Sequence, residues 1–252
     1  MVRLVSGNVD LSASPCGWMA PTSKQPQFAT FYNTKFAGSN LASGGLRAQV
    51  VGAPVLTAGI EGKELPYLTT TGGTHYLMTS VPETPSGTII TVARMMVPPT
   101  GNVNDGVVVG NYDAGNTMLL YTAATAPEGA VRGRMPQLSP AGFNAVPPLK
   151  SQMRDWLLCA LRWSCTENVS SGTVQCITLN AKSSQTGAGL NAKLGTSYLS
   201  IGSQSYSVNT KNQSGVIDHA FTGIWDYQLN EDEMGDVVGI IKNWGLKYGQ
   251  KI

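Results

Sequence analysis

Residues 220–233 read AFTGIWDYQLNEDE, and they join a strand-like run to the start of a helix. Asn230 is a good N-cap, because its side-chain oxygen can accept a hydrogen bond from a free amide of the first turn. Glu233 stands at the third helical position, where its carboxylate can reach back to the amide of the cap. The sequence therefore predicts a strand over 220–228 and a helix that begins at residue 231.

The predicted helix, residues 231–248, has one apolar face. Its large apolar residues recur at steps of three and four, which places them on one side of a helix. They are Met234, Val237, Val238, Ile241, Trp244 and Tyr248. Such a face must dock on another element. Since the chain before it reads as strands and loops, we expect the helix to cover a β-sandwich.

Short strands separated by turns are expected before the helix. Residues 87–97 are apolar on both faces, so this strand should be buried inside the sandwich. Residues 107–112 and 117–121 flank a turn-forming segment and predict a hairpin. A second hairpin is predicted for 154–166 and 172–180, whereas 181–196 are rich in Gly, Ser, Ala and Lys and read as a surface loop. The count of about ten strands and one helix fits a two-sheet jelly-roll sandwich.

The N-terminal region shows neither a helical nor a strand period. Residues 1–37 contain Pro15, Pro21 and Pro26 among several Ser, Thr and Asn residues. We therefore expect an extended N-terminal arm over 1–37 and one sandwich domain with its C-terminal helix over 38–252.

Several segments resemble the concanavalin A-like, laminin G-like jelly rolls. The pattern Ile224-Trp225-Asp226-x-x-Leu229-x-x-x-Glu233 resembles their closing strand and helix. Residues 40–45 (NLASGG), 50–54 (VVGAP), 76–79 (YLMT) and 88–94 (TIITVAR) look like the opening strands of such modules in tail proteins of bacterial viruses and prophages. The resemblance implies an all-β sandwich in a virion or cell-surface context, and it supplies no ligand.

Composition excludes several classes of protein. Hydrophobic residues make up 42% of the 252 residues and charged residues only 13%, so a large core is available. The formal net charge is +2, with Lys and Arg scattered, and this gives no stripe for a phosphate backbone. We expect no nucleic-acid partner. The sequence shows neither an apolar run of signal-peptide length nor one long enough to span a membrane, so we expect a protein that is made in the cytoplasm and stays there or is released by lysis. Together with the virion context that the resemblance implies, this predicts a virion protein assembled in the host cytoplasm.

The four cysteines are Cys16, Cys159, Cys165 and Cys176, and none has C-x-x-C spacing. A strand over 154–165 would place Cys159 and Cys165 on one face with Trp163. Burial as small hydrophobes is therefore expected rather than a disulfide.

The residues that would support an enzyme are sparse. A glycan-cleaving enzyme needs two carboxylates flanking the bond, or a base near an aromatic hydroxyl. The densest acidic cluster, 231–233, begins a helix, where negative charge complements the helix dipole. Asp226 is a single carboxylate at a strand end, and His75 and His219 are the only histidines. We therefore predict no catalytic residue, no metal and no cofactor.

Binding a glycan requires fewer specific groups than cleaving one, because a sugar site needs an aromatic face and a few polar groups. Several predicted loops and strand ends offer that mixture. The candidate glycan-binding residues are Tyr112, Asp113, Asn116, Tyr121, Arg132, Arg134, Tyr206 and Asn209. The alternative for each is a packing or turn-forming role.

The sparse catalytic candidates, together with the tail-protein context that the resemblance implies, predict a non-enzymatic structural or adhesion module of a phage or prophage tail. Its expected partners are other virion subunits, further copies of itself as a homo-oligomer, and bacterial surface polysaccharide. One alternative is a polysaccharide-degrading glycosidase or lyase on the same fold. Another is a purely structural decoration protein that contacts no glycan.

Overall fold

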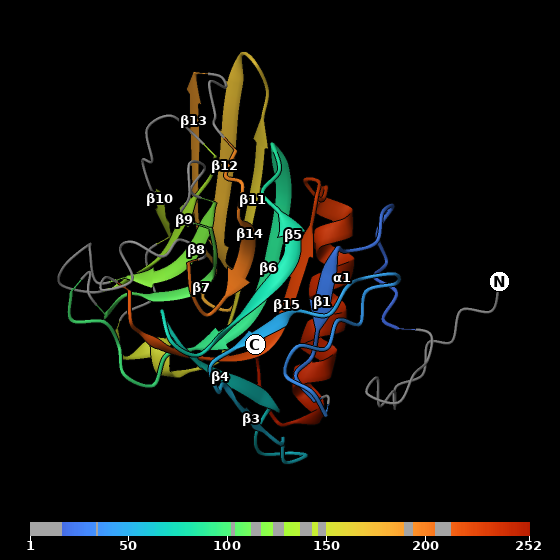
Figure 1. Cartoon of the computed structure of the whole chain (residues 1–252), viewed down its shortest axis with the longest axis vertical. Coiled ribbons are helices and arrows are strands. Elements are labelled where there is room, and N and C mark those ends of the chain that lie inside the picture. The colour runs from blue at the N-terminus through green and yellow to red at the C-terminus, as the bar shows by residue number, and fades with distance from the viewer. Residues whose placement is uncertain are drawn as a thin grey trace.

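The chain folds into two antiparallel sheets that pack face to face, with one helix on the outside (Figure 1). The structure, a computed structural model, describes residues 17–33, 35–101, 104–111, 117–122, 129–136, 143–145, 150–188, 194–204 and 213–252. This architecture confirms the predicted fold class, an all-β sandwich of jelly-roll type with a C-terminal helix.

Among the described residues, the larger sheet has eight strands, each antiparallel to its neighbours. Its main path runs β13-β12-β11-β6-β15-β4-β3. Strand β1 pairs with the C-terminal part of β15, whose N-terminal part pairs with β4. The strands are β1 (Phe28–Thr30), β3 (Val55–Thr57), β4 (Tyr67–Thr71), β6 (Ser86–Arg94), β11 (Leu157–Cys165), β12 (Val169–Cys176), β13 (Ala181–Ala188) and β15 (Val216–Trp225).

The described part of the smaller sheet has seven strands in the order β10-β9-β8-β7-β14-β5-β2. They are β2 (Gln49–Val51), β5 (Tyr76–Pro82), β7 (Gly106–Gly110), β8 (Met118–Thr122), β9 (Ala130–Arg134), β10 (Phe143–Ala145) and β14 (Tyr198–Ile201). A 3-10 turn, η3 (Gln152–Arg154), precedes β11. Both predicted hairpins are present, because β7 pairs with β8 and β11 pairs with β12.

Strand β6 is buried on both faces, as its sequence predicts. Ile89 and Ala93 point into the core between the sheets. Ile90 and Val92 point to the outer face of the larger sheet and join a second apolar cluster there. All four side chains are fully buried. The strand ends at Arg94, three residues before the predicted end.

The second apolar cluster lies between the larger sheet, helix α1 (Glu231–Lys247) and the segment 17–33. Aromatic rings dominate it: the Trp18 and Phe31 ring centroids are 5.5 Å apart, and those of Phe31 and Phe221 are 4.6 Å apart. Figure 1 shows α1 beside β1 and β15, on the side of the molecule away from β7, β8 and β9. The helix therefore docks on the sandwich through its apolar face.

The start of α1 matches the prediction. The Glu233 amide donates to Oδ1 of Asn230 (2.9 Å), and the Asn230 amide donates to Oε2 of Glu233 (3.1 Å), which completes a capping box. The predicted apolar face is also confirmed. Met234, Val237 and Ile241 are buried, and Val238, Trp244 and Tyr248 are partly buried in the same cluster.

Replacing Asn230 by Ala should lower the free energy of unfolding by about 1 kcal/mol, because the first turn of α1 loses its side-chain acceptor. Urea denaturation followed by tryptophan fluorescence measures the change. Asn243→Ala is the matched control, since Asn243 is exposed in the body of α1 and should leave stability unchanged or slightly raised. Equal stability of Asn230→Ala and wild type would contradict a stabilising cap.

The prediction of a surface loop over 181–196 is wrong for the first half of this segment. Residues Ala181–Ala188 form β13, the edge strand of the larger sheet, and pair residue by residue with β12. Because β13 is an edge strand and most of its described side chains reach solvent, it needs no alternation of apolar residues. The count of about ten strands was too low for a related reason: short edge strands such as β1, β2 and β3 give almost no periodic signal.

The described part of residues 1–37 packs against the sandwich. Strand β1 belongs to the larger sheet, and Trp18 and Phe31 are buried under α1. The domain boundary after residue 37 stays a prediction, and residues 1–16 lie outside the described residues.

The cysteines of β11 face the inter-sheet core, as predicted. Cys159 and Cys165 share that face with Trp163, while Trp156 lies in the cluster on the opposite face. Cys159, Cys165 and Cys176 are buried free thiols, and Cys16 lies outside the described residues. Over the part of the chain that the structure describes, no helix is long and apolar enough to cross a membrane.

Candidate functional site

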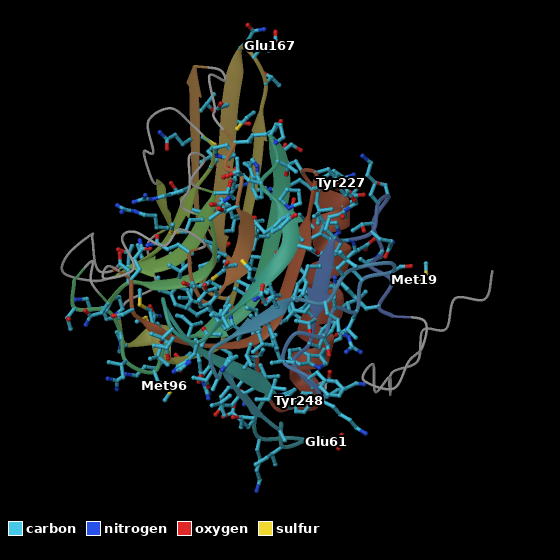
Figure 2. The ribbon with its side chains drawn as sticks, in the orientation of Figure 1. Met19, Glu61, Met96, Glu167, Tyr227 and Tyr248 are labelled. Carbon is cyan, nitrogen blue, oxygen red and sulfur yellow. The ribbon has the colours of Figure 1, made fainter. Side chains whose placement is uncertain are left out.

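A shallow polar groove of about 280 Å³ opens beside the end of β15. We name it the Asp226 groove. One wall is 24–27 and the other is 43–45, and Asp226, which contacts Gln27, completes the lining. The lining residues are Lys24, Gln25, Pro26, Gln27, Ser43, Gly44, Gly45 and Asp226. Tyr227, the next residue, lies near one end of α1 and Tyr248 near the other (Figure 2).

Asn40 holds the two walls together. Its Oδ1 accepts from the amides of Ala29 and Ala42, both at 3.0 Å. Its Nδ2 donates to the carbonyl oxygens of Gln27 (3.0 Å) and Leu46 (3.1 Å). The side-chain amide thus makes four hydrogen bonds to backbone on both sides of the groove, which fixes the spacing of the walls.

Glycines shape the second wall. A Cβ on Gly45 would lie 2.1 Å from Nδ2 of Asn40, so only glycine fits beside this brace. Gly44 has a φ of +73°, a left-handed conformation that glycine adopts at low cost. The Ser43-Gly44-Gly45 turn therefore brings backbone close to the groove without filling it.

The first wall is held by the N-terminal turn of α1. Oε1 of Glu233 accepts from the Ser23 amide (2.8 Å) and from the Tyr227 hydroxyl (3.1 Å). Burial acts to raise the pKa of Glu233, but the hydrogen bonds from Ser23, Asn230 and Tyr227 outweigh it and leave that pKa below its ordinary value. The Lys24 ammonium lies 5.5 Å from the Tyr227 ring centroid, a cation–π contact that holds it beside the groove.

The exposed groups in the groove suit a polyhydroxylated ligand. Asp226 supplies a carboxylate whose Oδ2 accepts from Nε2 of Gln27 (3.2 Å). Lys24, Gln27 and Ser43 are also exposed and add an ammonium, an amide and a hydroxyl. The Gln25 amide instead bonds to the backbone of Ala20, so its role is structural. The mixture of donors and acceptors matches sugar hydroxyls, although no described aromatic ring lines the groove.

Three of the predicted glycan-binding residues lie among the described residues. Tyr121 is fully buried between the sheets and donates to the Ala93 carbonyl oxygen (2.9 Å), a packing role that removes it from the solvent-facing candidates. Arg132 and Arg134 lie half-buried on β9, on the face opposite to Val131 of the inter-sheet core. Burial, and then the charge of Arg134, lower the pKa of Arg132. The remaining candidates, Tyr112, Asp113, Asn116, Tyr206 and Asn209, lie outside the described residues.

A second polar cluster lies on the outer face of the larger sheet. Arg94 donates to Oδ2 of Asp218 (3.0 Å) and to both carboxylate oxygens of Glu64 (3.2 Å each). Its guanidinium carbon lies 4.2 Å from the Trp156 ring centroid and 5.0 Å from that of Tyr67. Burial acts to lower the pKa of Arg94, but the two carboxylates outweigh it and raise that pKa. The cluster is a satisfied ion-pair network.

The two histidines have structural surroundings. His219 is fully buried between the sheets, and its Nε2 lies 2.9 Å from the Thr70 hydroxyl. Burial lowers the pKa of His219 to about 3. His75 is exposed, and its Nδ1 accepts from the Ala53 amide (3.0 Å). Within the described residues, no three His, Cys, Asp or Glu side chains gather closely enough to hold a metal ion.

Sequence comparison finds no matching protein family and no matching curated protein. The fold, however, is similar to receptor-binding domains of botulinum neurotoxins. The match to the type G receptor-binding domain covers 87% of this chain and 52% of the toxin domain, at 8% sequence identity and a TM-score of 0.56. The match to the botulinum neurotoxin serotype D binding domain covers 90% of this chain and 54% of the toxin domain, at 7% sequence identity and a TM-score of 0.56. The match to the binding domain of botulinum neurotoxin DC in complex with SialylT covers 88% of this chain and 52% of the toxin domain, at 9% sequence identity and a TM-score of 0.55.

These similarities establish the β-sandwich fold and no more, because the identities are so low. The chain spans about half the length of the toxin domains it matches. None of the three is described as a phage protein, so the phage-tail assignment stays a prediction.

Sequence reasoning missed the Asp226 groove. It identified Asp226 as a single carboxylate at a strand end and 40–45 as part of a resemblance, but it had no means of joining them to 24–27. The nearest signal was Ser43-Gly44-Gly45, a turn with little side chain that a ligand can approach closely.

Proposed function

We propose that this chain is a non-enzymatic structural or adhesion module of a phage or prophage tail, which binds a bacterial surface glycan through the Asp226 groove. The observation that carries the proposal is the lining of this groove, where exposed hydrogen-bond donors and acceptors converge from three separate segments. A volume of about 280 Å³ is near the lower end of ligand sites, which suits one sugar unit of a longer chain.

The pre-formed geometry of the groove supports binding. Asn40 and Glu233 fix its two walls through hydrogen bonds that need no ligand. A rigid site loses little conformational entropy when a ligand binds, so a few hydrogen bonds suffice for useful affinity. The similar toxin domains are receptor-binding domains, which agrees with a binding role for the shared sandwich.

The engagement of several described carboxylates supports a non-enzymatic role. Glu64 and Asp218 pair with Arg94, and Glu231 pairs with Arg162 at 2.7 Å. Glu83 is buried and accepts from the backbone amides of Thr117 and Gly195. Glycosidases require an acid and a second carboxylate that both face the scissile bond. Among the described residues that line it, the Asp226 groove has one carboxylate, that of Asp226.

Replacing Asp226 by Ala should weaken binding of the best glycan about 10–100-fold, because hydrogen bonds to a charged group contribute about 1.5–3 kcal/mol. A glycan array selects the ligand, and titration calorimetry compares the variants. Asp236→Ala is the matched control, since it removes the same charge from an exposed position of α1. Equal affinity of Asp226→Ala and wild type would contradict the assignment of the site.

A further inference from the structure

Two buried cysteines lie directly opposite each other on adjacent strands of the larger sheet. Cys159 of β11 pairs with Cys176 of β12. The Ile177 amide donates to the Leu158 carbonyl oxygen (2.8 Å), so residues 158 and 177 form a hydrogen-bonded pair. Because the two kinds of pair alternate, 159 and 176 form a non-hydrogen-bonded pair. Figure 1 shows β11 and β12 as long neighbouring strands.

This position has the geometry that a disulfide needs. In non-hydrogen-bonded pairs the Cα atoms lie about 4.5 Å apart and the side chains lean together. Disulfides span Cα separations of about 4.4–6.8 Å. The backbone of β11 and β12 therefore needs no rearrangement to accept a bond between the two sulfurs. Cys165, by contrast, faces Ser170 across the same two strands.

The two thiols differ in their readiness to react. Burial raises the pKa of Cys159, whereas the hydrogen bond with Cys159 lowers the pKa of Cys176. Cys176 is also the last residue of β12 and directly precedes the turn to the edge strand β13. It is the thiol that a small reagent reaches first when this edge of the sheet opens locally.

We propose that Cys159 and Cys176 form a redox-sensitive pair, which closes to a disulfide between β11 and β12 when the protein meets an oxidising medium. The co-reactant is a small organic disulfide. The Cys176 thiolate attacks one of its sulfurs and displaces a thiolate, leaving a mixed disulfide. The Cys159 thiolate then attacks the Cys176 sulfur and displaces the second thiolate. The protein loses two electrons and two protons, and the reagent gains them as two thiols.

Closing this bond should stabilise the sandwich. It joins two strands of the larger sheet, and in the unfolded chain it closes a loop between residues 159 and 176, which lowers the conformational entropy of that state. We expect the thermal midpoint of the oxidised protein to rise by about 5–10 °C, since disulfides around loops of this size have that order of effect. Added reductant should reverse the rise.

The test uses the full chain and hydroxyethyl disulfide, applied both to the folded protein and during refolding from urea. Remaining thiols are alkylated, and the protein is digested with trypsin. The expected product links peptide 155–162, which holds Cys159, to peptide 163–182, which holds Cys165 and Cys176. Cys165→Ala should keep the link and thereby assign it to Cys176, whereas Cys176→Ser should abolish it.

Three outcomes would overturn the proposal. The first is that both thiols remain open to alkylation after refolding with the oxidant. The second is a link to Cys16 or Cys165 in place of Cys176. The third is a correctly linked protein whose thermal midpoint does not exceed that of the reduced protein. Cys159→Ala serves as a second variant: it should lose both the link and the rise in midpoint, and retention of either would contradict the pairing.

Discussion

An Arg94→Met variant should lose about 3 kcal/mol of unfolding free energy. Arg94 is the cation that neutralises both Glu64 and Asp218 on the outer face of the larger sheet. Its removal leaves the Asp218 carboxylate, only 10% exposed, without a cation, and a buried charge that loses its partner costs about 3–5 kcal/mol. Glu64 is 32% exposed and can turn to water, so we take the lower end of that range.

Urea unfolding at neutral pH measures this loss, and two variants bracket it. Arg154→Met removes an exposed arginine and should change stability by less than about 0.5 kcal/mol. Arg94→Lys keeps the positive charge but not the planar group that lies over Trp156, so it should fall between wild type and Arg94→Met. If Arg94→Met had the same urea midpoint as wild type, the cluster would add nothing to the stability of the sandwich.

Stability should also fall as the pH drops from 7 to 5, because of His219. Burial lowers its folded-state pKa to about 3, from an ordinary value of 6.5. Between these values the unfolded chain takes up a proton that the folded chain does not, so the free energy of unfolding decreases as the pH falls. The Nδ1 atom has no hydrogen-bond partner among the described residues. A proton on this atom would therefore have no acceptor, which disfavours the charged imidazolium in the folded protein. We expect a loss of about 2 kcal/mol by pH 5 and about 4 kcal/mol near pH 3.

The measurement is urea unfolding at several pH values between 7 and 5, where His219 titrates in the unfolded chain and carboxylates contribute little. His219→Leu should abolish most of the pH-dependent loss whatever its own stability at pH 7. His75→Gln, which changes an exposed histidine, should retain it. An undiminished loss in His219→Leu would assign the effect to another group.

The helix and the buried strands could be predicted because their signals are local. The capping box needs only Asn230 and Glu233, three residues apart, and the apolar face of α1 follows from its helical period. Strand β6 is apolar on both sides because it is covered on both sides. Strand β13 could not be predicted, since pairing with β12 rather than its own composition makes it a strand.

The candidate site could not be predicted because it is assembled from distant parts of the chain. Gln27 meets Asp226 across 199 positions of sequence, and Ser23 meets Glu233 across 210. No local pattern encodes such contacts. Tyr121 illustrates a different error: a tyrosine at the end of a predicted strand suggested a ligand-binding role, but its ring is fully buried in the core. A single sequence does not distinguish the two faces of a short strand when both carry large side chains.

Binding without cleavage is the central claim, and mass spectrometry of the bound glycan tests it most directly. The oligosaccharide chosen by the glycan array is incubated with a stoichiometric amount of protein, and its chain length and reducing ends are then measured. We predict a complex with wild type, a much smaller bound fraction at the same concentration with Asp226→Ala, and an oligosaccharide recovered intact. Shortened products that depend on the protein would contradict this account and make the chain an enzyme.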